Sequence, residues 1–302
     1  MTGIMQMFVG GAPGGRGAQT YDAPGTYCWV APPGVTKVSV VTIGAGYSIS
    51  GAGSGASGGG GLNYGNNISV TPGSSYSLRV GNSVSPCSVG RRSCFNGSYI
   101  AAGAFSTSSG SGLHSGGNGC QGGGGAAGYS GNGGGGGSGG SGASGSSGSG
   151  GGGGGGAGYF YQQTGNVSVP CLTCGGFVCA PQTVLFSGGG GGGGVQVLGQ
   201  GSSGAGGLWT SSLSNGGGGG SFGSGGGATA IQSGGNGGAY GGGGGAANQY
   251  LACPVSAFVC CGVRYYNWSI ISNGAPGTSG SGAVRIVWPG DTRQFPSTDV
   301  GA

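Results

Sequence analysis

Glycine-rich tracts recur along most of this chain and leave no room for an ordinary helical or Leu/Ile/Val-packed architecture. The tracts occupy residues 51–61, 122–128, 131–158, 188–194, 216–227 and 237–247. Glycine accounts for 92 of the 302 residues, and it disfavours an α-helix by about 1 kcal/mol per residue relative to alanine. We therefore expect almost no α-helix. Two alternatives remain for the tracts: flexible linkers, or an ordered structure in which glycine is the building unit.

A three-residue periodicity in the longest tract favours the ordered alternative. Serine recurs at every third position, and an unbroken line of glycine runs beside it: Ser138, Ser141, Ser144 and Ser147, then Gly139, Gly142, Gly145, Gly148 and Gly151. A polyproline-II-type helix has three residues per turn and no internal hydrogen bonds. One edge of such a helix would carry no side chains here. We predict an array of polyglycine-II-like helices, packed side by side, whose peptide groups bond to neighbouring helices.

The low charge of the chain also argues against flexible linkers. Disordered chains usually combine low hydrophobicity with high charge, whereas only 4% of these residues are charged and 35% are hydrophobic. Ordering one residue costs about 1–2 kcal/mol of backbone entropy, and one hydrogen bond contributes about 0.5–1.5 kcal/mol net. Because these quantities nearly balance, we expect the order to be cooperative and to be completed by hydrophobic contacts.

Strand signals lie at both ends of the chain. Residues 21–46 alternate Pro-Gly pairs with aromatic and β-branched runs, which is typical of strands and turns. Residues 66–81 predict a hairpin around the TPGSS turn, and GAVRIVWPG near the C-terminus predicts another strand with Val284, Ile286 and Trp288 on one face. We expect the N-terminal strands and the VRIVW strand to share one small sheet. The predicted fold class is mainly β with a polyglycine-II-like helix array.

Composition along the chain divides it into four predicted segments. Residues 1–20 form an N-terminal arm, 21–110 a β-rich domain, and 111–250 the polyglycine array. Residues 251–302 supply a C-terminal strand and tail that close the β domain. The array is therefore expected as an insertion between parts of one β domain.

The ionisable residues are too few and too scattered for most enzymatic or nucleic-acid-binding functions. The chain has no glutamate, one histidine (His114), and three aspartates at its ends: Asp22, Asp291 and Asp299. General acid–base catalysis needs positioned titratable groups, so we expect no enzyme activity and no cofactor. The net charge of +5 is spread along the chain, whereas nucleic-acid binding needs a concentrated basic surface. We also expect neither an export signal nor membrane insertion.

Ten cysteines allow three interpretations. Cys87 and Cys94, and likewise Cys253 and Cys260, are separated by six residues and are candidate disulfide pairs. Cys171, Cys174 and Cys179 are weak zinc candidates, because a second Cys-x2-Cys is missing. The third alternative is that the cysteines are small buried hydrophobic residues.

Aromatic clusters between the tracts are the candidate recognition residues. They form three inserts: Tyr159, Phe160 and Tyr161; Trp209; and Tyr265, Tyr266 and Trp268. Aromatic side chains dominate binding hot spots, so loops that carry them suit a binding surface. The alternative is that these side chains cap the array or pack against neighbouring subunits.

Two phrases in the sequence resemble a known family. The opening APGTYCWVAPPGVTKVSVVTIGAG, followed by glycine tracts, resembles glycine-rich domains of bacteriophage tail fibres and adhesins. The ending GSGAVRIVWPGDTRQFPSTDV is similar to the C-termini of glycine-rich virion proteins of marine phages, especially cyanophages. The resemblance implies a structural virion protein that presents loops to the host surface, with other virion proteins and a host glycan or outer-membrane protein as partners. It also implies a homo-oligomeric or multi-copy assembly.

Two other functions remain open at the level of the sequence. One is a capsid decoration or fibre protein without a receptor role. The other is a cellular glycine-rich wall or matrix protein, which should carry an export signal. The family adhesins do not share the ten cysteines of this chain.

Overall fold

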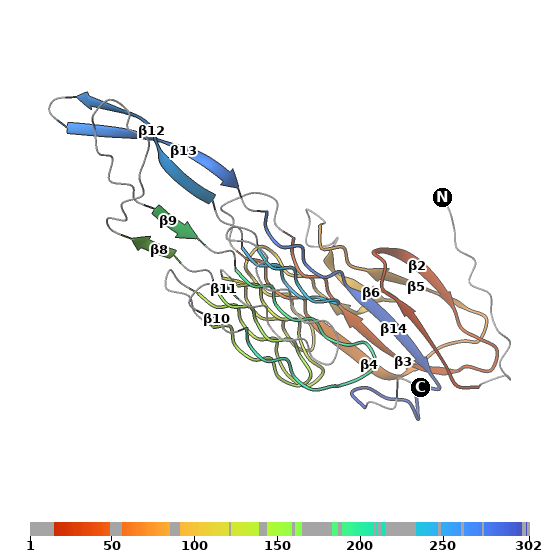
Figure 1. The fold of residues 1–302 in the computed structure, drawn as a ribbon. Coiled ribbons are helices and arrows are strands. Elements are labelled where there is room, and N and C mark those ends of the chain that lie inside the picture. The colour runs from red at the N-terminus through yellow and green to blue at the C-terminus, as the bar shows by residue number, and fades with distance from the viewer. Residues whose placement is uncertain are drawn as a thin grey trace.

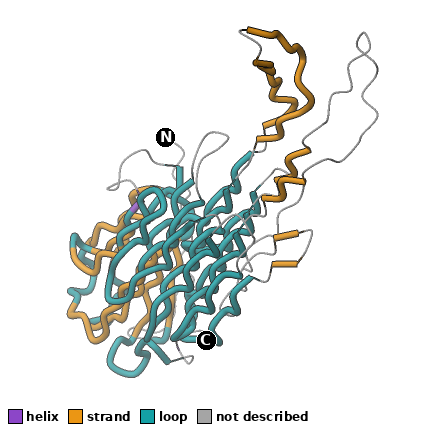
Figure 2. The backbone as a smooth tube through the Cα atoms, turned by 90° about the vertical axis from the view of Figure 1, so that its left-hand side faces the viewer, coloured by secondary structure: helices purple, strands orange, loops and turns teal. Residues whose placement is uncertain are grey.

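The fold is mainly β with almost no helix (Figure 1). The computed structural model describes residues 15–48, 56–84, 91–120, 122–138, 144–158, 161–164, 183–186, 189–207, 209–210, 213–214, 234–246, 249–260, 263–273, 275–297 and 300. Figure 2 shows that strands gather on one side of the body and in hairpins that project from it, while the rest of the body consists of long segments that are neither helix nor strand.

Two four-stranded antiparallel sheets stack on each other. In sheet A the order is β1 (Gly17–Tyr21), β14 (Ala283–Trp288), β3 (Lys37–Ile43) and β4 (Leu62–Ser69). In sheet B it is β2 (Gly25–Val30), β5 (Ser75–Val80), β6 (Ser93–Phe95) and β7 (Ser98–Ala101). The VRIVW strand does share a sheet with N-terminal strands, since β14 pairs with β1 and β3. The expectation of a single small sheet was wrong, because β2 and β5 belong to the second sheet.

A hydrophobic layer rich in aromatic rings joins the two sheets. Trp29 of β2 is 1% exposed, and its ring centroid lies 5.9 Å from Tyr76, 6.3 Å from Phe95 and 5.9 Å from Trp288. Val284 and Ile286 of β14 belong to the same cluster. The short strands can bury large rings here because alternate residues of a strand point to the same face.

The predicted hairpin at residues 66–81 was wrong. β4 pairs with β3 in sheet A, whereas β5 pairs with β2 and β6 in sheet B. The turn at 71–74 therefore carries the chain from one sheet to the other. Val70, Leu78 and Val80 all enter the layer between the sheets, and this shared burial outweighs direct pairing of the two arms.

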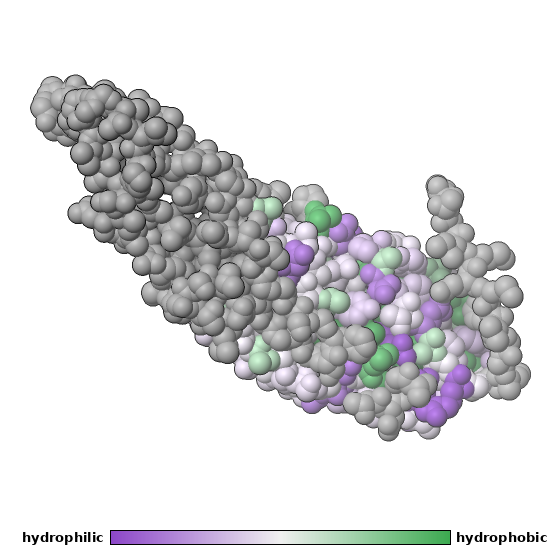
Figure 3. All heavy atoms as spheres, in the orientation of Figure 1, coloured by the Kyte–Doolittle hydropathy of each residue, from purple (hydrophilic) through white to green (hydrophobic). Residues whose placement is uncertain are grey.

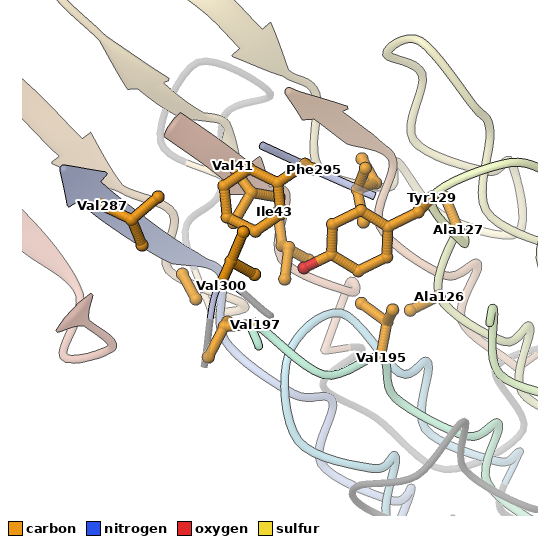
Figure 4. Close-up of a cluster of buried hydrophobic side chains, with 12 residues drawn as sticks. Val41, Ile43, Ala126, Ala127, Tyr129, Val195, Val197, Val287, Phe295 and Val300 are labelled. Atoms are coloured by element: carbon orange, nitrogen blue, oxygen red, sulfur yellow. The ribbon is translucent and has the colours of Figure 1, made fainter. Parts of the chain in front are cut away.

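The second face of sheet A is covered by glycine tracts rather than by water. Val41 and Ile43 of β3 and Val287 of β14 lie in a second cluster, which also contains Tyr129 and Val195 from the tract region. Figure 4 shows the rings of Tyr129 and Phe295 between these strand residues and Val195. The central strands of sheet A, β3 and β14, are thus buried on both faces, which explains their almost continuous apolar runs.

The tract bundle is held together by backbone hydrogen bonds between segments. We use this name for the described tracts 56–61, 122–128, 132–138, 144–149, 152–158, 189–195, 201–207, 234–239, 241–246 and 275–282. In tract 122–128 the partner segment repeats at every third residue: Gly122 and Gly125 donate to Gly137 and Gly134, Gly123 and Ala126 to Gly190 and Gly193, and Gly124 and Ala127 to Ser57 and Gly60. Successive peptide groups therefore point to three different neighbours.

The same tract also accepts hydrogen bonds on its other sides. Its carbonyl groups accept from residues of the segments 115–120, 152–158 and 241–246. Tract 122–128 therefore bonds to six neighbouring segments, and all seven of its residues are buried. It lies inside the bundle, where the N–H groups of residues 122–127 all find their partners on other segments.

Packing in the bundle leaves no space for side chains on the inner edges. A Cβ atom added to Gly145 or Gly148 would come closer than 3.0 Å to backbone atoms of the tract 152–158. These two glycines belong to the unbroken line in the sequence, whereas Ser144 and Ser147 are exposed. The three-residue pattern thus separates an inward glycine edge from an outward serine edge in the described part of this tract.

The predicted domain boundaries fall inside structural units. Residues 17–20 of the predicted arm belong to β1, and the tract 56–61 of the predicted β domain bonds to tract 122–128. The β sandwich and the tract bundle therefore interleave along the chain.

Tyr129 gives a pH-dependent prediction for this fold. Its hydroxyl donates to the Gln196 carbonyl at 2.9 Å, and burial raises its pKa well above the ordinary value of 10.0. A raised folded-state pKa contributes stability that is complete below the unfolded pKa near 10 and is lost as pH rises further. Tyr129→Phe should be less stable than wild type by about 1 kcal/mol at neutral pH, and this deficit should shrink above about pH 10.

Urea unfolding of both proteins between about pH 8 and about pH 11.5 measures this difference. Tyr21, whose pKa burial raises to about 12, and Tyr240 remain in both proteins and supply a common background loss. Parallel decreases in the two unfolding free energies would contradict the role assigned to Tyr129.

Candidate functional site

Three hairpins are inserted between glycine tracts at one end of the tract bundle. β8 (Tyr161–Thr164) and β9 (Thr183–Phe186) lie between tracts 152–158 and 189–195. The second hairpin, β10 (Trp209–Thr210) and β11 (Leu213–Ser214), lies between tracts 201–207 and 234–239. The third, β12 (Gln249–Cys260) and β13 (Val263–Asn273), lies between tracts 241–246 and 275–282. Figures 1 and 2 show the pairs beyond the same end of the bundle.

Hydrogen bonds between the tracts fix this common position. Gly190 donates to Ala157 O, Gly189 to Ala246 O, and Gly277 to Gly245 O. Gly234 donates in the same way to Ala275 O. The tract residues that precede and follow the inserts are therefore neighbours, and we call this end of the bundle the hairpin end.

The sequence-predicted aromatics fall in these inserts. Tyr161 begins β8, and Trp209 begins β10 opposite Ser214. In β13 Tyr265, Tyr266 and Trp268 stand opposite Phe258, Ala257 and Pro254. Tyr159 and Phe160 lie outside the described residues. The structure brings the inserts that carry these residues to one end of the molecule, and β9 contacts β12 there.

The cysteine predictions stay predictions. Cys253 and Cys260 are both in β12, Cys94 is a free thiol, and Cys87 lies outside the described residues. The zinc candidates Cys171, Cys174 and Cys179 also lie outside them. Within the ranges that the structure describes, no group of three His, Cys, Asp or Glu residues is arranged to hold a metal.

A cluster that sequence reasoning missed lies in the sandwich, near the hairpin end. Arg91 is fully buried, its Nε donates to Ala104 O at 2.6 Å, and its guanidinium carbon lies 4.5 Å from the Tyr47 ring centroid and 5.2 Å from that of Phe105. The two rings are 6.1 Å apart. Phe105 is 58% exposed. Its isolated position among small residues in AAGAFSTSSG gave no periodic signal.

The described carboxylates lie away from the hairpin end. Asp22 accepts a hydrogen bond from Tyr240 at 3.3 Å, and Tyr240 lies in the turn between tracts 234–239 and 241–246, opposite the hairpins. Asp291 follows β14, which leads the chain away from them. Of the carboxylates that the structure describes, Asp22 and Asp291, neither therefore lies at the hairpin end.

On the face that Figure 3 shows, the coloured residues are mostly pale and near-neutral in hydropathy, with scattered apolar and polar residues among them. No described helix has the length and apolar character needed to cross a membrane. Comparisons with family models, with curated proteins and with solved structures find no match to this chain.

Proposed function

We propose that this chain is a non-enzymatic structural protein of a bacteriophage particle, of the tail-fibre or adhesin type, that presents its hairpins to the host surface. One observation carries the proposal: three separate inserts with the aromatic clusters emerge from the same end of a hydrogen-bonded bundle. A rigid support for exposed loops is the arrangement in which binding residues are usually displayed. The opening and closing sequences resemble those of glycine-rich virion proteins, and this resemblance is the reason for proposing that the protein is located on the phage particle.

The proposal includes a bundle made of polyglycine-II helices. Hydrogen-bond partners that repeat at every third residue support a threefold helix. Close glycine contacts between neighbours support the same packing, since any Cβ on the inner edges would overlap a backbone atom. Such helices lack internal hydrogen bonds, so the bonds between them supply the rigidity that display requires.

Attachment to host cells and location on the particle test the function together. The purified chain should bind cells that the particle infects, and antibodies against it should label tail fibres of intact particles. A matched control replaces residues 249–273 by a short Gly-Ser turn, which can close because Gly277 donates to Gly245 O at 3.0 Å. The control should remain folded and bind less.

Labelling confined to the head lattice would favour the decoration function and overturn the adhesin proposal. Absence from the particle would overturn the virion assignment. Binding that is equal for the wild type and the control would contradict the role of the largest hairpin.

A further inference from the structure

We propose that Tyr47 and Phe105 form a platform that binds a neutral sugar residue of a glycan at the hairpin end. This inference rests on the proposed function and names a ligand class for it. The platform uses side chains of the β sandwich, not the aromatic residues of the inserts.

The geometry of the cluster leaves one ring accessible and holds both in place. The rings are tilted by 33° with centroids 6.1 Å apart, and both contact the guanidinium group of Arg91. Arg91 is anchored by its Nε bond to Ala104 O, and its own carbonyl accepts from Ala45 N. A cation against a ring is attractive. The rings are therefore held on a rigid base, while Phe105 remains 58% exposed.

The platform lies on the side of the sandwich that faces the hairpins. Gly58 donates to Ser106 O, and its neighbour Ser57 donates to Gly244 O, close to the point where the chain enters β12. On the other side of the platform, Ser48, which follows Tyr47, donates to Ser83 O. A glycan held by the inserts can therefore extend over these rings.

The turn that carries the exposed ring also carries three residues with hydroxyl groups, Ser106, Thr107 and Ser108. Phe105 and Ser108 exchange two backbone hydrogen bonds, at 3.1 and 3.0 Å, which closes a tight turn through Ser106 and Thr107. All four residues of this turn are exposed. Hydroxyls can both donate and accept, as the alternating hydroxyl groups of a sugar require.

The tight turn places Ser106 in a left-handed backbone conformation. Ser106 has a φ of 55°, a left-handed conformation that costs a residue other than glycine about 1 kcal/mol or more. Glycine would adopt it without strain, and this chain uses glycine freely. Serine at this position gives the residue after Phe105 a hydroxyl group, and strained residues of this kind cluster at binding sites.

A neutral sugar fits this chemistry better than a charged ligand. One face of a hexose carries C–H groups with partial positive charge, and the face of an aromatic ring is partially negative. The charge of Arg91 is covered, because this residue is 0% exposed. The described carboxylates lie away from the hairpin end, as noted above. Stacking on the ring, with hydroxyl contacts around it, therefore supplies recognition without an ion pair.

The test of the platform is to measure binding of the full chain to a panel of neutral oligosaccharides. Sialylated and sulfated versions of the same oligosaccharides serve as the charged comparison. Phe105→Ala should weaken binding of the neutral members at least about tenfold, the loss expected for a hot-spot residue. The matched control is Leu113→Ala, because Leu113 is 52% exposed and adjoins His114, which pairs with Leu62 beyond the far end of tract 56–61. This control should bind like wild type.

Three results would overturn the platform: no neutral member bound, a preference for charged members, or equal binding by Phe105→Ala and Leu113→Ala. The proposed function would still stand if the wild-type chain bound host cells. The converse outcome is also distinguishable. If the protein is absent from particles and does not bind host cells, the proposed function is overturned. If it nevertheless binds sugars in a way that depends on Phe105, the platform proposal still stands.

Discussion

Gly134→Ala is expected to destabilise the protein by at least about 3 kcal/mol, at the upper end of the range for overpacked sites. An added Cβ would come closer than 3.0 Å to the Ser146 carbonyl oxygen and to the nitrogen of Gly155. Both atoms belong to backbone that is itself bonded to neighbouring tracts, so neither can move away at low cost. Gly134 also donates to Gly153 O at 2.9 Å, and a shift would weaken this bond.

Gly135→Ala is the matched control, because it lies one residue further in the same tract. Among the described residues, the only heavy atom within 4 Å of its added Cβ is Asn118 O at 3.8 Å. The change should be neutral or should stabilise the protein by up to about 1 kcal/mol, since alanine restricts the unfolded chain. Thermal or denaturant unfolding followed by tryptophan fluorescence compares the two variants. Equal stabilities would show that the tracts do not pack as described.

Phe295→Ala is the second change with a large expected effect, a loss of about 3–5 kcal/mol. Phe295 is 2% exposed and stacks on Tyr129, with centroids 5.6 Å apart and planes at 14°. Asn66 fixes its backbone by accepting from Phe295 N at 2.9 Å and donating to Phe295 O at 2.6 Å. The substitution would leave a cavity between sheet A and the tract bundle.

Phe105→Ala serves as the control for this prediction, because it removes the same side chain from a site that is 58% exposed. It should change the unfolding free energy by less than about 1 kcal/mol, although it loses the contact with Arg91. Denaturant unfolding of both variants gives the two values. A small effect of Phe295→Ala would mean that the C-terminal segment contributes little to the core.

The sequence predicted the character of the tracts better than their partners. Glycine content predicted the near absence of helix, and the three-residue pattern anticipated the inward edge at Gly145 and Gly148. Which tract bonds to which could not be predicted, because glycine carries no side chain to distinguish one neighbour from another. The side chains that do distinguish one tract from another lie where the bundle meets sheet A, such as those of Ala126, Tyr129 and Val195.

The sequence indicated the regions of β2, β3, β4, β5 and β14, but it did not predict their pairing or the remaining strands. Alternation in residues 66–81 is equally consistent with a hairpin and with a crossing between sheets, since both bury Leu78 and Val80. The aromatic inserts were identified from their composition, and their common end was found only from the register of the flanking tracts. Phe105 could not be recognised because a single exposed ring has no periodicity.

The burial of the central strands of sheet A on both faces has a consequence for any attempt to divide this protein. An excised sandwich would present Val41, Ile43 and Val287 to water, and an excised bundle would present Tyr129 and Val195. Neither half has a complete interior of its own. The sandwich and the tract bundle therefore need each other to bury their apolar side chains. We expect fragments cut where the glycine tracts begin or end to associate through these exposed side chains.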